Sequence, residues 1–323
     1  MFAVRGIAVS LSIFVLVYSV LSVSVCGVWR KVWGWACARQ HPQRECADLL
    51  FTLRMLPLVI AVGVTLILAV PSFLELEPRA VSEPLGGMPL ALSVCGMGMM
   101  FAGIWNAAAA LTRASRVIAR WSREASVVGS TAVGSNGSVS VRRSLGSVPP
   151  LTTAGIVRPT VWLSAAAEFV LTERELRSAL RHEIAHVRRR DNLRKLMLRV
   201  VAFPGMAALE CAWRETTEMA ADDAAVSSVS EALDLAAAVI KLSRLASLQP
   251  PTELTTALVH SPAGSVNTRV ERLIAWKELR RNPASGYSVG YALCAAAGAV
   301  AALAVTYSAL LVRMHAATEW LVR

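Results

Sequence analysis

Four stretches of the chain are apolar for about the length of a membrane-spanning helix. They lie at about residues 6–27, 55–74, 88–111 and 288–312. The hydrocarbon core of a bilayer is roughly 30 Å thick, and a helix needs about 20 consecutive apolar residues to cross it. The pattern therefore predicts a mainly α-helical, multi-pass protein of the cell (inner) membrane with four transmembrane helices in contact with the lipid bilayer.

The first stretch shares some features with a secretory signal peptide. It lacks a clear Ala-x-Ala cleavage site, only Arg5 precedes it, and a basic segment follows it. We therefore expect a retained helix within residues 1–27.

Charges beside the apolar stretches predict the orientation of the chain in the membrane. The charged residues of segment 28–54 are mostly Arg and Lys, whereas those of segment 75–87 are three Glu and one Arg. Cytoplasmic loops are enriched in Arg and Lys, so 28–54 is expected to be a cytoplasmic loop and 75–87 an external loop. Alternation then places the segment 112–287 in the cytoplasm, and both termini, including the tail 313–323, outside.

Between the third and fourth apolar stretches the composition becomes mixed. Gly, Ser and Val are frequent in residues 127–150, where Asn136-Gly137 is typical of a tight hairpin turn. Pro159–Leu163 predicts a further strand. Thr172 and Glu175 then form a capping-box pattern that starts an amphipathic helix. We expect a cytoplasmic α+β domain over 112–287, inserted between the third and fourth helices.

That helix carries the motif His182-Glu183-Ile184-Ala185-His186, which is HExxH. Two histidines four residues apart lie on the same helix face and can share one zinc ion. Glu183 stands beside them, where it can act as the general base on a zinc-bound water. The motif predicts a zinc metalloprotease with one Zn²⁺.

A catalytic zinc site needs a third protein ligand. Glu218 and Asp222 share one face of a second predicted helical stretch, Glu215–Ala224. Glu218 is the expected third ligand, with Glu215 as the competing candidate. Asp222 is expected to orient His182 or His186, because metal-bound histidines usually donate their other N–H to a carboxylate.

Several motifs together resemble the M56 peptidases, typified by the BlaR1 and MecR1 antirepressors. They are HExxH followed by Arg188–Leu193, the segment Glu218–Val226, the upstream Thr153–Pro159 and the downstream Arg269–Leu273. The resemblance implies a gluzincin-type protease domain with His182, His186 and Glu218 as zinc ligands. It also implies that Glu183 is the base and that Asp222 supports the site.

The resemblance further implies a regulatory role, in which the enzyme cuts a cytosolic transcriptional repressor of the winged-helix type, or its own chain, after an external signal. The antirepressors carry an external penicillin-binding sensor after the fourth helix, and only residues 313–323 follow that helix here, so direct β-lactam sensing is not expected. A quality-control protease for membrane proteins is the alternative. A non-catalytic receptor or scaffold is a third hypothesis, which the intact Glu183 disfavours.

Two further residues are candidates for stabilising the transition state. His260 and Arg269 lie where related membrane zinc proteases tend to place a histidine and an arginine near the site, so either could stabilise an oxyanion. The run Arg188–Arg190 is expected to be a solvated helix end that complements the helix dipole, with anionic lipid headgroups as the alternative partner.

Two further apolar segments are predicted to be helices of the domain between the third and fourth spans. Residues 196–213 are interrupted by charged residues and a proline, and we expect a core or interface-lying helix there. In the segment 231–246 the apolar residues Leu233, Ala237, Ile240 and Leu245 are expected to pack in the core.

Composition and charge exclude other classes of protein. Hydrophobic residues make up 55% of the chain and charged residues 17%, and the mean hydropathy is +0.51. The net charge of +11 comes from Arg and Lys that flank the apolar stretches, so direct nucleic-acid binding is not expected. The six cysteines form no CxxC pair, which disfavours a disulfide scaffold or a thiolate zinc site.

Overall fold

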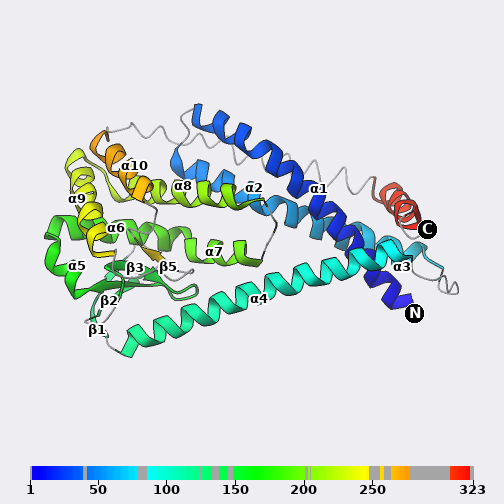
Figure 1. Ribbon diagram of the computed structural model, residues 1–323, viewed down its shortest axis with the longest axis horizontal. Coiled ribbons are helices and arrows are strands. Elements are labelled where there is room, and N and C mark those ends of the chain that lie inside the picture. Colours follow the sequence, from blue (N-terminus) through cyan, green and yellow to red (C-terminus); the bar gives the residue numbers. More distant parts are fainter. Residues whose placement is uncertain are drawn as a thin grey trace. The chain divides into compact units, whose positions relative to one another are not determined.

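The computed structural model describes residues 2–38, 42–78, 86–123, 125–132, 138–144, 148–200, 203, 205–246, 255–257, 263–276 and 306–320 (Figure 1). The chain divides into two compact units. A helical unit comprises Met1–Val28, Met55–Phe101 and Leu279–Arg323. An α+β unit comprises Trp29–Arg54 and Ala102–Glu278, and it contains the HExxH motif.

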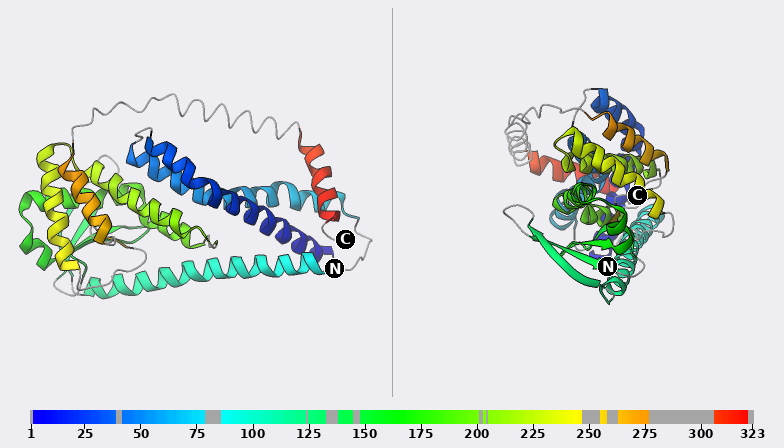
Figure 2. Two further views of the ribbon diagram at one scale, coloured as in Figure 1. Left: turned by 45° about the horizontal axis from the view of Figure 1, so that its top comes forward. Right: turned by 90° about the vertical axis from the view of Figure 1, so that its left-hand side faces the viewer.

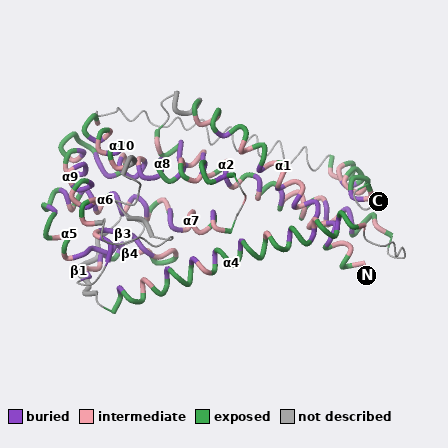
Figure 3. The backbone as a smooth tube through the Cα atoms, in the orientation of Figure 1, coloured by how far each residue is buried: buried purple, intermediate pink, exposed green. Residues whose placement is uncertain are grey.

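Long helices dominate the first part of the chain. They are α1 (Phe2–Ala38), α2 (Gln43–Val64), a π-helical turn (Thr65–Ala69), α3 (Val70–Leu76) and α4 (Gly87–Arg123). Three helical stretches of the described residues are long and apolar enough to cross a membrane: Phe2–Gly34, Gln43–Leu76 and Gly87–Arg123. Much of α4 is exposed (Figure 3), including Phe101 and Trp105. Outward-facing apolar side chains of this kind suit a lipid environment.

The helices extend beyond the predicted boundaries. Segment 28–54, expected to be a loop, consists mostly of the last turns of α1 and the first turns of α2. Hydropathy detects only the stretch that matches lipid, so it misses polar helical turns on either side. Most of the predicted fourth span, 288–312, lies outside the described residues. The described helix 306–320 includes most of the segment 313–323 that was expected to be a tail.

A proline shapes the second of these long stretches. Pro71 has no N–H, so it cannot donate to the carbonyl of Ile67, four residues earlier. The hydroxyl of Tyr307 donates a 3.0 Å hydrogen bond to that carbonyl. The helix 306–320 is thus attached to the π-helical turn by a side-chain hydrogen bond.

The α+β unit contains a five-stranded sheet in the order β1-β2-β4-β3-β5. The strands are β1 (Ala125–Ala132), β2 (Ser138–Ser144), β3 (Leu151–Ala154), β4 (Thr160–Ser164) and β5 (Thr255–Ala257). Strands β2 and β4 pair in parallel, and the other neighbours are antiparallel. The predicted hairpin is confirmed by the pairing of Ala132 with Ser138, although Asn136 and Gly137 lie outside the described residues.

Each face of the sheet contacts a different helix. On β4, Val161 and Leu163 join the main hydrophobic core, whereas Trp162 packs against Trp121 of α4 on the opposite face, with ring centroids 5.7 Å apart. This alternation follows from the two-residue period of a strand. Helix α6 (Glu173–Arg189) packs against β3, β4 and β5 (Figure 2).

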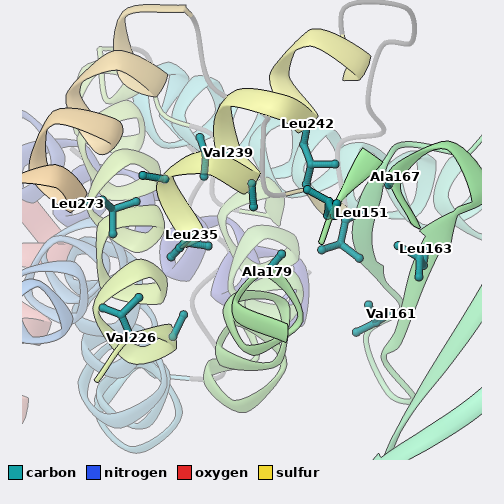
Figure 4. Close-up of a cluster of buried hydrophobic side chains, with 14 of the residues drawn as sticks. Leu151, Val161, Leu163, Ala167, Ala179, Val226, Leu235, Val239, Leu242 and Leu273 are labelled. Carbon is teal, nitrogen blue, oxygen red and sulfur yellow. The ribbon is translucent and has the colours of Figure 1, made fainter. Parts of the chain in front are cut away.

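The main core lies between the sheet and helices α6, α9 (Val229–Ala246) and α10 (Ala263–Ile274), with α5 (Ala165–Val170) at its border. Figure 4 shows Leu235, Val239 and Leu242 of α9 directed into it. The predicted core face of α9 was wrong for two residues: Leu233 and Ile240 are exposed. The buried face follows the neighbouring helical stripe through Ala232, Leu235, Ala236, Val239 and Leu242.

The segment 196–213 is also corrected. It is not one helix but the end of α7 (Asp191–Val200) and the start of α8 (Ala207–Ala225). Gly205 adopts a positive φ of 93° in the connection, a backbone conformation that other residues rarely adopt. The break allows α8 to form the second helix of the candidate site.

Local signals define both ends of α6. The predicted capping box is confirmed: the Thr172 hydroxyl accepts from the Glu175 amide, and the Glu175 carboxylate accepts from the Thr172 amide. At the other end Arg190 has a left-handed conformation (φ 54°, ψ 41°) and closes the helix. The chain therefore turns within one residue, and α7 starts at Asp191.

Gly155 follows β3 with φ of +101°, and a Cβ there would lie 2.8 Å from the carbonyl oxygen of Arg158. We expect Gly155→Ala to lower the free energy of unfolding by about 1–3 kcal/mol, because the turn is both strained and crowded. Thermal unfolding in detergent tests this. Gly98→Ala in α4 is the control, since nothing lies within 4 Å of its added methyl group; equal melting temperatures for both variants would contradict the expectation.

Candidate metal centre

Helix α6 brings the two histidines of the HExxH motif together. His182 and His186 are one turn apart, and they are 0% and 2% exposed. Their Nε2 atoms lie 3.0 Å from each other. Burial and close approach of two ring nitrogens define a single point toward which both side chains are directed.

Glu218 of α8 completes a group of three. Its Oε2 lies 3.4 Å from His182 Nε2, and its Oε1 lies 3.6 Å from His186 Nε2. In a tetrahedral site with metal–ligand bonds of about 2.0–2.1 Å, neighbouring ligand atoms are roughly 3.3 Å apart. The separation of the two nitrogens, and the distance from each nitrogen to its nearer Glu218 oxygen, are close to this value. One ligand atom from each residue lies within 4.8 Å of the others, so these residues are able to hold one divalent cation.

The opposite nitrogen of each histidine faces a buried carboxylate. His182 Nδ1 lies 2.9 Å from Asp222 Oδ1, and His186 Nδ1 lies 2.7 Å from Asp191 Oδ2. If each Nδ1 carries the proton, both Nε2 lone pairs are directed at the same point, where a cation removes their repulsion. The expected pairing of Asp222 with a histidine is present. Sequence reasoning missed Asp191, although its position directly after the helix-ending arginine run was a usable signal.

Arg269 of α10 is buried and contacts two carboxylates of the site. It forms two hydrogen bonds to Asp222, of 2.8 and 2.7 Å, and its Nη1 lies 3.1 Å from Glu218 Oε2. Its guanidinium thus connects Glu218, a candidate ligand, to Asp222, the carboxylate beside His182. This engagement favours a positioning role over the predicted contact with an oxyanion.

Glu215 stands apart from this group. Glu215 is exposed on α8 and does not join the three converging residues. His260 lies outside the described residues, so its predicted role stays a prediction.

Glu183 is 0% exposed, and a residue of the sheet holds its carboxylate in place. The hydroxyl of Thr153 in β3 donates a 2.7 Å hydrogen bond to Glu183 Oε2. Among the described residues no group donates to Oε1, which is buried. One carboxylate oxygen is therefore fixed, while the other is available to accept a proton. Sequence reasoning did not identify Thr153 as a functional residue.

Asn192 fixes the end of strand β3. Its side-chain amide donates to the carbonyl oxygens of Thr153 and Gly155, at 3.3 and 3.2 Å. Because Thr153 holds Glu183, the second residue of α7 helps to set the position of the carboxylate.

Burial and neighbouring charges shift the ionisation of the site in opposite directions. Burial raises the pKa of Glu183, and the nearby His186 and His182 only partly oppose it. Burial alone would lower the pKa of His182, but Asp222 and Glu218 outweigh it and raise that pKa to about 9. Burial also disfavours the charged form of Glu218, yet His186 and Arg269 hold its pKa well below the usual range. Glu218 thus stays ionised, as a metal ligand must, while Glu183 keeps affinity for a proton.

A comparison with family models identifies the class of protein. The model described as BlaR1 peptidase M56 matches residues 91–273, which is more than half of the chain. The chain belongs to the M56 peptidase family. The matched region of this M56 peptidase contains all the residues that converge at the candidate centre, and it confirms the resemblance inferred from the motifs. No curated protein matched the chain.

Replacing Thr153 should change the pH dependence of peptidase activity. The Thr153 hydrogen bond lowers the pKa of Glu183, so Thr153→Val should raise that pKa further. A general base must be ionised, so the acidic limb of the kcat/KM profile should move to higher pH. Thr153→Ser keeps the hydroxyl and is the control. A profile for Thr153→Val that coincides with that of the wild type would show that this hydrogen bond does not tune the base.

Proposed function

We propose that this M56 peptidase is a zinc-dependent endopeptidase in which His182, His186 and Glu218 hold one zinc ion. The convergence of two imidazole nitrogens and one carboxylate at a single buried point carries the proposal. Two histidines and a glutamate form a familiar ligand set for catalytic zinc, with one position left for water or substrate.

Bound zinc would lower the pKa of a water ligand and polarise the carbonyl of the scissile bond. Glu183 would accept a proton from that water on its unpaired Oε1 and later transfer it to the leaving amine. Thr153 holds the other oxygen of Glu183 during both transfers. Asp222 and Asp191 keep each histidine in the tautomer that presents Nε2 to the metal.

The burial and incomplete hydrogen bonding of Glu183 support a catalytic site over a purely structural one. A carboxylate that is 0% exposed is unfavourable for folding unless it is fully paired, and one of its oxygens accepts no hydrogen bond from the described residues. A scaffold or receptor gains nothing from such a group, whereas a hydrolase requires it as a base.

Among possible roles we favour signalling. The family model is that of the BlaR1 peptidase, and the three long apolar helices suggest a membrane protein. We infer that the protease domain lies in the cytoplasm, where it cleaves a transcriptional repressor of the winged-helix type, or its own chain, in response to an external signal. Quality control of membrane proteins is the alternative that substrate identification would reveal.

Conservative replacements of the two glutamates should separate catalysis from metal binding. Glu183→Gln keeps the side-chain shape but removes the base, so it should retain about one zinc per chain and lose proteolysis. Glu218→Gln removes a charged ligand, so it should lose both zinc and activity. Metal analysis of the purified protein, with His186→Ala as the metal-free reference, checks the assignment. Zinc retained by Glu218→Gln and lost by Glu183→Gln would reverse the two roles.

The zinc-loaded Glu183→Gln variant also tests the physiological role, because it should hold a substrate without cutting it. Cross-linking in cells followed by identification of the retained protein should yield one soluble DNA-binding repressor or the chain itself. Recovery of many unrelated, damaged membrane proteins would instead support the quality-control role.

The charge pattern makes a separate prediction about topology. A phosphatase that is active only outside the cytoplasm should be active when fused near residue 80 and inactive when fused near residue 150, because basic segments remain inside. Activity only in the second fusion would reverse the proposed orientation.

A further inference from the structure

The first turns of α2 belong to the same compact unit as the metal centre, although α2 continues without interruption into a candidate membrane span. The boundary of the α+β unit falls at Arg54, within the helix. One face of these turns is almost completely buried, through Cys46, Ala47, Leu50 and Arg54. This part of α2 is therefore packed as an element of the α+β unit.

Two contacts fix these turns to α8, which carries Glu218. Arg54, 2% exposed, forms a 2.9 Å ion pair with Glu210. The ring of Phe51 packs against Trp213, with centroids 6.0 Å apart. This part of α2 is thereby attached to a helix of the metal centre.

A chain of charged side chains leads from α2 to a histidine of the centre. Asp48 Oδ1 lies 3.5 Å from Nη2 of Arg189, whose Nε lies 3.6 Å from Oδ1 of Asp191. The other oxygen of Asp191 is the one that contacts His186 Nδ1 at 2.7 Å. Arg189 thus lies between two carboxylates, one on α2 and one on α7.

The arginine run was predicted to be a solvated helix end, and this is wrong for its middle residue. Arg188 and Arg190 are exposed, whereas the side chain of Arg189 is only 11% exposed. The left-handed turn at Arg190 brings Arg189, the last residue of α6, and Asp191, the first of α7, close to each other. Burial and two carboxylate neighbours indicate a specific task for Arg189.

We propose that Asp48 and Arg189 are positioning residues that hold Asp191 against His186 and so set the affinity of the site for zinc. Through Asp48, a helix that continues into a candidate membrane span acts on a metal-binding histidine. Asp48 lies outside the region matched by the family model. The inference rests on the zinc site proposed above.

The exposure of Asp48 provides a way to separate this role from a merely structural one. Its side chain is 43% exposed, and ion pairs at that level of exposure add little to stability. Asp48→Asn also weakens the 2.6 Å pair between Asp48 and Arg194. Arg194 still lies over the Phe51 ring in that variant, and the pair of Arg54 with Glu210 does not involve Asp48, so α2 keeps other attachments. A change at Asp48 should therefore affect zinc more than folding.

The experiment measures zinc dissociation constants of the purified full-length protein in detergent, by competition with a chromophoric chelator. Asp48→Asn and Arg189→Gln should each weaken zinc binding about 10-fold, the low end of the range for residues that support metal ligands. Arg189→Lys keeps the charge and should restore part of the loss. The double variant should bind zinc no more weakly than either single variant, because both changes break one chain of contacts.

Arg177→Gln is the matched control, since it removes an exposed ion pair with Glu173 on the same helix and should leave zinc affinity unchanged. Zinc affinities of Asp48→Asn and Arg189→Gln equal to that of this control would overturn the inference and leave the zinc site intact. A lower melting temperature of the metal-free Asp48→Asn protein, in proportion to its lost affinity, would also overturn it. A wild-type protein without zinc affinity would overturn the proposed function itself.

Discussion

Two buried imidazole nitrogens that face each other at 3.0 Å impose the main constraint on this structure. Each ring is held in that orientation by a carboxylate behind it, and each carboxylate comes from a different helix. A bound cation would remove the repulsion between two unprotonated Nε2 atoms, and without the carboxylates the rings would be free to rotate away. The placement of α7 and α8 relative to α6 follows from this requirement.

Arg269 compensates part of the negative charge of the centre. Glu218 and Asp222 are both ionised, and Arg269 of α10 lies against both of them. A buried arginine with two carboxylate partners is held in place strongly, because the loss of either partner leaves an uncompensated charge. This arrangement connects α10 to the metal centre through specific charge pairs.

Much of the site could be predicted from the sequence, because its signals are local. HExxH and the capping box each depend on residues within one or two helical turns, and the structure has both on α6. Asp191 and Thr153 were missed because their roles depend on how separate segments meet: a one-residue left-handed turn in one case and a strand beneath α6 in the other. The core face of α9 was wrong for a related reason. Several apolar stripes run along that helix, and only packing against α6 and the sheet selects one.

The hydrogen bond between Tyr307 and the carbonyl of Ile67 has a consequence for biosynthesis. The two residues are 240 positions apart, and residues 102–278 of the α+β unit are translated between them. Until Tyr307 emerges from the ribosome, the Ile67 carbonyl lacks this donor, and Pro71, four residues after it, has no N–H to supply one. The second apolar stretch therefore gains this contact only after residues 306–320 have been synthesised.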